Sequence, residues 1–496
     1  MPRRRVSPRG RHAVDAVIVG AGPNGLAAAV ILARAGLRVE VHEAAATPGG
    51  GARTEELTVP GHHHDVCSAV HPMGLASPFF RAFDLAAHGV RMLQPEVAYA
   101  HPLDGGRAGL AWRDLDRTAE ELGVDGRAWR GLLAPLVRAW PGLVGVAMSD
   151  LRGLPPDPIT ALALARRMAE QGSPAWNLRF RGATAPAMLT GVTAHAIAPP
   201  RALAPAGAGL LLAALAHAVG WPIPEGGSAV VVEALVRDLV AHGGRVITGS
   251  RIDRLDQLPP ANAVLLDLAP AGLLRIAEAD LPPSYVRALR RFRHGGAACK
   301  VDFALTGPVP WSAPGCALAG TLHLIGTRDE AVAAERAVAR GVHADRPYVL
   351  AAQPGVVDAT RAPAGRHTLW TYAHVPNGSD VDVSAVVTAQ IERFAPGFRD
   401  LVAAVGVRTA LDVERHDAND VGGDIAAGAV TLWQTVARPV PRIDPYATPL
   451  PGVYLCSAST PPGPGVHGMA GLHAARRVLR TRFGIRTDPL RLLRLP

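Results

Sequence analysis

The chain has 496 residues, of which 48% are hydrophobic and 19% charged, and its formal net charge is +9. These values exclude a disordered protein and a small disulfide-stapled domain, and they predict two or three lobes around substantial cores. The four cysteines form no CxxC pair. This spacing argues against a structural zinc site and a redox-active dithiol, and it favours a reducing, cytoplasmic setting.

Residues 1–12 contain five arginines and precede the first predicted strand. We expect a disordered basic arm here and no nucleic-acid interface, because aromatic residues do not interleave with the arginines. We expect no secretory signal, and no stretch reaches membrane-spanning length. The apolar run at 207–219 predicts a buried helix. Peripheral membrane contact stays open, as does the oligomeric state.

The first ordered unit is a predicted βαβ unit. Residues 14–19 predict a buried parallel strand, residues 26–35 a helix, and residues 37–42 a second strand that ends at Glu43. A GxGxxG turn joins the first strand to the helix, and the residues expected to hold a pyrophosphate there are Gly20, Gly22, Pro23, Asn24 and Gly25.

Each part of this unit has a physical task. Gly20 permits the tight turn, Gly22 lets the backbone approach a phosphate, and Gly25 lets the helix pack closely on the strand. Glu43 lies 18 residues past Gly25, so its carboxylate is expected to accept hydrogen bonds from the hydroxyls of an adenosine ribose.

The remaining elements alternate between helices and strands. The pattern is helical and irregular from about residue 80 to 220, and it includes a predicted helix at 158–171. The later segments predict a helix at 227–242, a strand at 245–248, a buried strand at 263–268, antiparallel strands at 298–305 and 318–325, a strand at 453–456 and a closing helix at 469–482.

A second glycine cluster, Thr-Pro-Gly-Gly-Gly-Ala-Arg-Thr, occupies residues 47–54. It resembles the double-glycine motif of FAD oxidoreductases with the amine-oxidase and phytoene-desaturase type of fold. The resemblance implies that the pyrophosphate and ribityl chain of FAD are wrapped by Gly49, Gly50, Gly51, Arg53 and Thr54. One departure is that Gly51 stands where the family often has Arg, and Arg53 follows two positions later.

Residues 451–471 resemble the closing flavin motif of the same family. There a strand delivers a loop to the flavin, and the next helix directs its positive N-terminus at the pyrimidine ring. The implied cofactor contacts are Ser457, Ala458, Val466, His467, Gly468 and Met469. Residues 463–468 also match GxGxxG, but no second strand ending in an acid follows, which argues against an NAD site.

The segments at 60–72, 220–228, 300–311 and 391–398 resemble the phytoene-dehydrogenase-related branch of this family. Within that branch the chain is similar, over nearly its whole length, to the pyridine nucleotide-disulfide oxidoreductase domain-containing protein 2 type. The resemblance adds Ser68 and Ile247 to the expected FAD contacts and places Asp424 and Trp433 near the active site. A β-hairpin that members have between residues 252 and 266 is missing.

The expected fold is therefore α/β. A Rossmann-like FAD-binding domain of the glutathione-reductase and amine-oxidase type is interleaved with an α+β substrate domain that contains an antiparallel sheet. The FAD-binding domain is expected to comprise residues 13–80, 222–297 and 415–485. Residues 81–221 and 298–414 would form the substrate domain, and residues 486–496 a tail.

Three residues are candidates for catalysis. Lys300 is the single lysine and lies in an apolar strand before Trp311. In flavin amine oxidases such a lysine holds a water against flavin N5, and the resemblance implies this role for Lys300; the alternative is a lysine that snorkels to solvent. Either His71 or Asp65 is expected to face substrate or the ribityl chain. His467 is expected to face the isoalloxazine ring, unless its role is structural.

A metal site is not expected. His62, His63 and His64 lie close to His71 in the sequence, but no acidic or cysteine partner completes a ligand set at a recognisable spacing.

The implied function is oxidation of a substrate C–H bond by hydride transfer to N5 of non-covalently bound FAD. The family implies a desaturase or dehydrogenase of an apolar or polyene-like small molecule, reoxidised by O2 or a quinone. Three alternatives stay open: a flavin amine or amino-acid oxidase, suggested by Lys300; a redox-neutral polyene isomerase; and a non-catalytic flavin-bearing scaffold.

Overall fold

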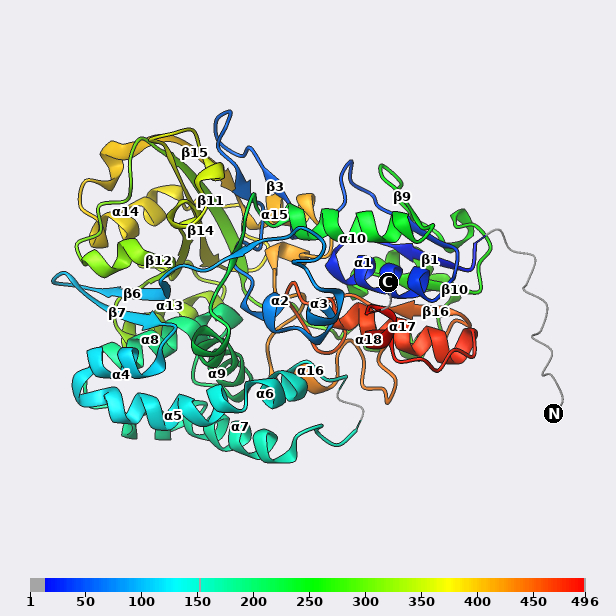
Figure 1. Cartoon of the computed structure of the whole chain (residues 1–496), viewed down its shortest axis with the longest axis horizontal. Helices are drawn as coiled ribbons and strands as arrows, with labels where there is room; N and C mark the ends of the chain where they lie inside the picture. The colour runs from blue at the N-terminus through cyan, green and yellow to red at the C-terminus, as the bar shows by residue number, and fades with distance from the viewer. Residues whose placement is uncertain (1–13, 151–152, 495–496) are drawn as a thin grey trace.

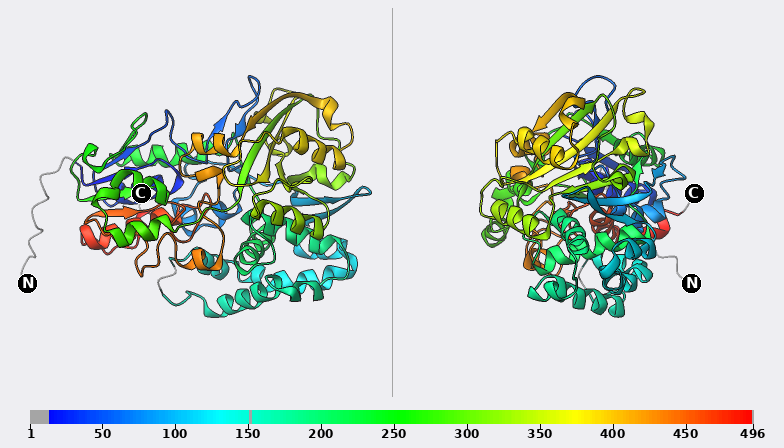
Figure 2. Two further views of the ribbon diagram at one scale, coloured as in Figure 1. Left: turned by 180° about the vertical axis from the view of Figure 1, so that it is seen from behind. Right: turned by 90° about the vertical axis from the view of Figure 1, so that its left-hand side faces the viewer.

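The computed structural model describes residues 14–150 and 153–494. One lobe is built on a parallel sheet and the other on a mixed sheet, and the two lie side by side along the long axis of the molecule (Figures 1 and 2). A group of helices lies beneath the mixed sheet in the view of Figure 1. The expected basic arm, residues 1–12, lies outside the described residues.

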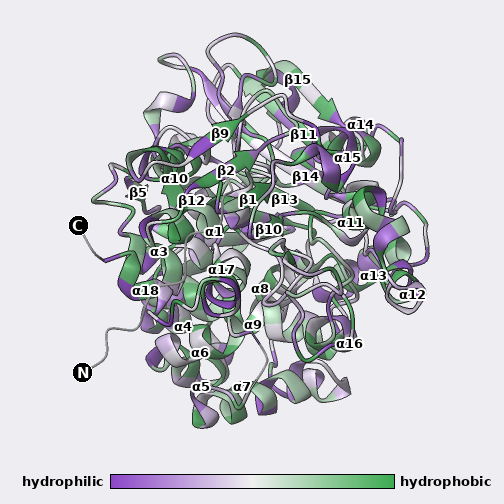
Figure 3. Ribbon diagram, turned by 90° about the vertical axis from the view of Figure 1, so that its right-hand side faces the viewer, coloured by the Kyte–Doolittle hydropathy of each residue, from purple (hydrophilic) through white to green (hydrophobic). Residues whose placement is uncertain are grey.

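The parallel sheet has the strand order β16–β10–β1–β2–β9. All residues of its β1 and β2 strands are buried. Figure 3 shows the hydrophobic colour of β1 and β2 between the surrounding helices, as expected for a parallel sheet that is covered on both faces. The strands are β1 (Ala16–Val19), β2 (Val39–His42), β9 (Arg245–Ile247), β10 (Ala263–Leu266) and β16 (Val453–Leu455).

Alternate residues of β1 face two different cores. Ala16 and Ile18 pack in the core that contains α1, whereas Val17 and Val19 pack in the core that contains the helices after β10. The helices of this lobe are α1 (Pro23–Arg34), α10 (Ala229–Ala241), α11 (Pro270–Ala277), α12 (Pro283–Arg290), α17 (Met469–Arg482) and α18 (Pro489–Leu492). The predicted tail thus contains α18, which packs on α3 (Pro78–Phe83).

The second sheet has the strand order β15–β11–β14–β13–β12–β6–β7. β6 pairs with β12 in parallel, and the other pairs are antiparallel, so the sheet is mixed rather than purely antiparallel. Its strands are β6 (Val97–Leu103), β7 (Arg107–Trp112), β11 (Ala297–Leu305), β12 (Ala319–Leu324), β13 (Val349–Ala352), β14 (His367–Val375) and β15 (Val402–Arg408).

Helix α9 (Leu203–Ala218) is largely buried among α5, α7 and α8, which confirms the buried helix predicted in this region. No helix in residues 14–150 and 153–494 is long and apolar enough to cross a membrane. The other helices of this lobe are α4 (Leu115–Glu121), α5 (Gly126–Arg138), α6 (Trp140–Ala147), α7 (Pro158–Gln171), α8 (Thr184–Thr193), α13 (Arg328–Ala339), α14 (Ser384–Phe394), α15 (Ala410–His416) and α16 (Leu432–Val436).

Short elements connect the lobes. They are β3 (Thr54–Glu55), β4 (His64–Asp65), α2 (Pro72–Ala76), β5 (Met92–Leu93) and β8 (Ile223–Pro224). Between β9 and β10 the chain forms only a short 3-10 helix, Leu255–Gln257. This arrangement confirms the predicted absence of a hairpin there.

Candidate functional site

The carboxyl ends of three neighbouring parallel strands meet at the glycine turn. Val19, the last residue of β1, lies opposite His42 of β2 and Leu266 of β10. The residues that follow these strand ends are Gly20, Glu43 and Asp267. The turn is therefore flanked by one acidic residue from each adjacent strand, in the crevice where α/β sheets of this type bind ligands.

The glycine turn has no room for side chains. A Cβ on Gly25 would lie 2.2 Å from the carbonyl oxygen of Gly20, and a Cβ on Gly22 would lie 2.8 Å from Oδ2 of Asp267. Gly22 is the N-cap of α1 and Pro23 its first residue, with no side-chain cap. Pro23 has no N–H and the N–H of Gly25 is donated to Asp267, so this turn offers an anion chiefly the positive end of the helix dipole.

Glu43 is held at the end of β2 by backbone donors. Its Oε2 accepts from the N–H of Ala21 and its Oε1 from the N–H of Ala45, both at 2.8 Å. The N–H of Glu43 in turn donates to the carbonyl oxygen of Ile247 at 2.8 Å. Each carboxylate oxygen retains a further lone pair, which fits the expected contact with ribose hydroxyls.

The second glycine cluster packs directly on the first. Gly49 donates its N–H to the carbonyl oxygen of Ala21 at 2.9 Å, and a Cβ on Gly50 would lie 3.3 Å from Cα of Gly22. Arg53 is buried and donates from Nη2 to the carbonyl oxygen of Thr47 at 2.8 Å. The two motifs thus form one continuous cradle of backbone groups.

The closing motif reaches the same cradle from β16. Ser457 follows this strand and is buried. The loop then passes the partly buried Ala458 and Val466 and ends at Gly468, which is the N-cap of α17 and has a φ of 68°. A Cβ on Gly471 would lie 2.0 Å from the carbonyl oxygen of Asn24, so α17 and α1 touch near their N-termini.

His467 is fully buried in this loop. Its Nδ1 accepts from the N–H of Met469 at 3.1 Å, and its Nε2 has no partner among the residues that the structure describes. Burial lowers the pKa of His467 to about 4, so the ring is neutral at neutral pH. Asn24 is likewise buried, and its Oδ1 also lacks a hydrogen-bond partner within the described ranges.

A pocket lies between the glycine cluster and the mixed sheet, and its empty space of about 400 Å³ includes open solvent. It brings together the predicted site residues Gly51 and Lys300. Its other lining residues are Val66, Cys67, Ala298, Tyr372, Arg408, Val413, His416, Asp417, Asp420 and Ile425. His71 and His467 are not among them.

Lys300 is buried in β11 and forms an ion pair with Asp302. Its Nζ also lies 4.9 Å from the centre of the Trp370 ring. Burial lowers the pKa of Lys300, although the Asp302 carboxylate opposes this shift. The side chain is therefore a cavity lysine and not one that snorkels to solvent. Its position relative to flavin N5 stays a prediction.

Asp302 was not predicted, although the alternation along a strand places residues 300 and 302 on one face. Asp302 also faces His64, at 3.4 Å from Oδ1 to Nδ1. His62 is buried, and its Nδ1 lies 3.3 Å from the carbonyl oxygen of Pro60. No group of three or more His, Cys, Asp or Glu side chains in the described part of the chain is arranged to hold a metal ion.

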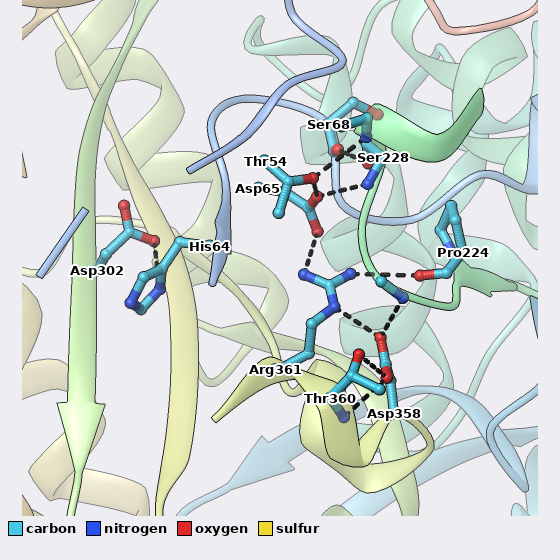
Figure 4. Close-up of polar contacts among 12 residues, drawn as sticks. Thr54, His64, Asp65, Ser68, Pro224, Ser228, Asp302, Asp358, Thr360 and Arg361 are labelled. Carbon is cyan, nitrogen blue, oxygen red and sulfur yellow. Dashed lines mark hydrogen bonds and ion pairs between the residues drawn. The ribbon is translucent and has the colours of Figure 1, made fainter. Parts of the chain in front are cut away.

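A buried polar network lies beside the cavity (Figure 4). Asp65 accepts from Oγ1 of Thr54 at 2.8 Å and from Nη1 of Arg361 at 3.0 Å. Ser228 donates its hydroxyl to the carbonyl oxygen of Ser68 and lies 2.8 Å from Nε2 of His71. Burial lowers the pKa of His71 to about 4, so this ring too is neutral at neutral pH.

Three acidic residues near the cradle were missed from the sequence. Burial raises the pKa of Asp267 to about 8 and also raises those of Asp417 and Asp420. Asp267 directly follows the end of β10, and this position is the sequence feature that could have identified it as a site residue. Asp417 and Asp420 lie in an irregular segment after α15, where local patterns give no indication of a site.

The two residues that the resemblance placed near the active site differ in burial. Asp424 is fully buried and accepts from the N–H groups of Gly295 and Gly428 at 2.8 and 2.9 Å. Trp433 is 68% exposed on α16. The Trp433 side chain faces solvent, and its placement near the active site stays a prediction.

These groups fit a dinucleotide cofactor. The glycine cradle admits a pyrophosphate because a Cβ would fill it, the N-terminus of α1 offers its positive dipole end, and Glu43 offers acceptors to a ribose. The second cluster extends the cradle to the cavity that contains Lys300, because Gly51 lines that cavity. This extension matches a cofactor longer than a mononucleotide.

Comparisons with known proteins agree with this geometry. A protein from Rattus norvegicus, "Pyridine nucleotide-disulfide oxidoreductase domain-containing protein 2", is 25% identical over 557 aligned residues, which cover 94% of this chain and 93% of that protein. A "4,4'-diapolycopen-4-al dehydrogenase" from Metabacillus indicus is 34% identical over 128 residues, which cover 24% of this chain and 25% of that protein.

Solved structures share the fold. Cyclohexylamine oxidase from Brevibacterium oxydans superposes with a TM-score of 0.58 at 15% identity, covering 97% of this chain and 98% of that chain. The family model described as "Flavin containing amine oxidoreductase" matches residues 24–479. Because that match spans most of the sequence, the chain belongs to the flavin-containing amine oxidoreductase family and is an FAD-dependent oxidoreductase.

Proposed function

We propose that this enzyme is a dehydrogenase that removes a hydride from a C–H bond of an apolar small molecule, in a desaturation of the CH–CH type. The observation that carries the proposal is the cavity beside the glycine cluster, where Lys300 lies among largely apolar walls. These walls include Val66, Ala298, Tyr372, Val413 and Ile425. Bound FAD supplies the hydride acceptor at N5.

In this proposal the residues of the chain bind and orient the substrate and exclude water from it. The cavity lies where the glycine cluster faces the mixed sheet, because Gly51 and Lys300 both line it. Lys300 presents an amine in a buried setting where electrostatic interactions are strong, and Asp302 partly balances its charge. The short match to a diapolycopenal dehydrogenase supports an apolar, polyene-like substrate.

An amine oxidase is the second candidate. Asp417 and Asp420 line the same cavity, and Tyr372 adds an aromatic ring. A carboxylate beside an aromatic face is a suitable site for a substrate ammonium group. Against it, burial raises the pKa of both carboxyl groups, which favours their neutral forms in the free enzyme.

The two candidate functions are distinguished by rapid anaerobic mixing of the FAD-loaded enzyme with a polyene or with a primary amine. Bleaching of the flavin by a detergent-solubilised polyene, with no bleaching by primary amines, is the result we expect. Bleaching by amines alone would replace the proposal with the second candidate, and bleaching by neither class would overturn both.

The electron acceptor is tested in the second half-reaction. The reduced enzyme is mixed with either O2 or a soluble quinone, and the return of flavin absorbance is followed. We expect one of the two to reoxidise the flavin at least about as fast as the enzyme turns over, since no step of a catalytic cycle can be slower than overall turnover.

A further inference from the structure

Asp267 lies directly beneath the glycine turn. Its Oδ2 accepts from the N–H of Gly25 at 2.8 Å, and the same atom would lie 2.8 Å from a Cβ on Gly22. Its backbone N–H donates to the carbonyl oxygen of Val19 at 2.8 Å, which fixes it at the end of β10. The side chain therefore occupies the place where the N-terminus of α1 meets a pyrophosphate.

The second carboxyl oxygen of Asp267, Oδ1, has no hydrogen-bond donor within residues 14–150 and 153–494. An ionised carboxylate here would face the negative charges of a pyrophosphate at short range, which is unfavourable in a buried site. A neutral carboxylic acid has one accepting oxygen and one O–H donor. That form satisfies both Gly25 and an anion at once.

We propose that Asp267 binds the cofactor pyrophosphate as a neutral carboxylic acid, with Oδ2 accepting from Gly25 and the acid proton donated to a phosphate oxygen. In this proposal Asp267 is a cofactor ligand that binds FAD only when its carboxyl group is protonated. No bond is formed or broken in this step, and the proton stays on Asp267 while the cofactor is bound.

The surroundings of Asp267 favour the neutral form. Burial raises its pKa to about 8, the Gly25 N–H opposes the shift, and Asp417 and Glu43 add to it. Cys456, after β16, is also buried, and its own pKa is raised well above the ordinary value. The cation of the second glycine cluster, Arg53, lies 3.7 Å from Glu43 rather than against Asp267.

The consequence is that protonation of Asp267 and binding of FAD are coupled. Below about pH 8 the acid already has its proton, and affinity for FAD is independent of pH. Above that value each binding event takes up one proton, so the dissociation constant rises by up to about tenfold per pH unit. The negative charge of the pyrophosphate raises the pKa of bound Asp267 further.

The test uses the flavin-free full chain and FAD itself. Dissociation constants are measured by flavin fluorescence from about pH 7 to about pH 9.5 for the wild type, Asp267→Asn and Asp417→Asn. Asparagine retains a carbonyl for Gly25 and an N–H donor for the phosphate but does not titrate. We expect Asp267→Asn to bind within about threefold of wild type at pH 7, with no loss at high pH.

Asp417→Asn is the matched control, since Asp417 is another buried acid near the cradle. It should keep the steep loss of FAD affinity at high pH, but the loss should begin at lower pH, because the charge of Asp417 helps to raise the pKa of Asp267. A flat profile for Asp417→Asn together with a steep one for Asp267→Asn would overturn the proposal, as would parallel profiles for Asp267→Asn and wild type.

Calorimetry of wild-type binding provides a second measurement that does not depend on the folding of any variant. Titrations at about pH 9 in two buffers with different ionisation enthalpies report the number of protons taken up per FAD. Uptake that approaches one proton supports the proposal, and uptake near zero overturns it.

Discussion

Nη1 of Arg361 lies 3.0 Å from Oδ2 of Asp65, although the two residues are 296 positions apart in the chain. Both side chains are only 1% exposed. Arg361 also pairs with Asp358, from Nε to Oδ2 at 2.7 Å. This ion pair ties the segment that contains β4, next to the cavity, to the mixed-sheet lobe (Figure 4).

Removal of this guanidinium should be strongly destabilising. Arg361→Met leaves the buried carboxylate of Asp65 without its partner, and we expect a loss of about 3–5 kcal/mol in the free energy of unfolding. Urea unfolding of the flavin-free protein measures it. The double variant Arg361→Met/Asp65→Asn should recover part of the loss, and a single variant within about 1 kcal/mol of wild type would show that the network contributes little.

Glu43→Ala should weaken FAD binding at least about tenfold. The substitution removes the acceptors offered to the ribose, and charge-assisted hydrogen bonds contribute roughly 1.5–3 kcal/mol. It also frees the N–H groups of Ala21 and Ala45, which loosens the turn. Flavin fluorescence titration provides the dissociation constant. Glu225→Ala, on the exposed Arg91 ion pair, is the control and should bind FAD like the wild type.

Lys300 requires a paired variant. Lys300→Met alone leaves Asp302 buried and uncompensated, so a loss of activity could reflect misfolding. Lys300→Met/Asp302→Asn removes both charges, and we expect it to fold and to retain FAD but to react more slowly in one half-reaction. Stopped-flow measurement of flavin reduction and reoxidation locates the loss. Asp302→Asn alone is the control, and rates equal to that control would make Lys300 a structural residue.

Buried histidines should make the fold sensitive to acid. Burial lowers the pKa of His71, His101 and His467 from 6.5 to about 4. Between about pH 6.5 and 4 these histidines bind protons in the unfolded chain but not in the folded state. The free energy of unfolding therefore falls as pH falls through this window.

Each of these histidines contributes up to about 3 kcal/mol to that fall. Denaturant unfolding across the window measures the slope. His101→Gln keeps a donor for the carbonyl oxygen of Gly326 and should flatten the slope by about one proton. A slope that is unchanged in this variant would mean that His101 does not titrate as its burial implies.

The sequence alone was sufficient for the parts of the site whose geometry is local. The GxGxxG spacing predicted the strand, turn and helix, and Glu43 was placed at the end of β2 because strand length and turn chemistry are properties of adjacent residues. The helix predicted at residues 469–482 has the observed bounds of α17. The missing hairpin before β10 was equally visible, because it is a deletion within one continuous segment.

The partners of the site residues were decided only by the tertiary structure. Arg361 meets Asp65, and Asp267 meets Gly25, across 296 and 242 positions. Such pairs depend on which segments pack together, and no local periodicity encodes that packing. Burial also depends on which segments pack together. Asp267, at the end of β10, has a pKa of about 8 only because the turn, the sheet and the segment after α15 exclude water around it.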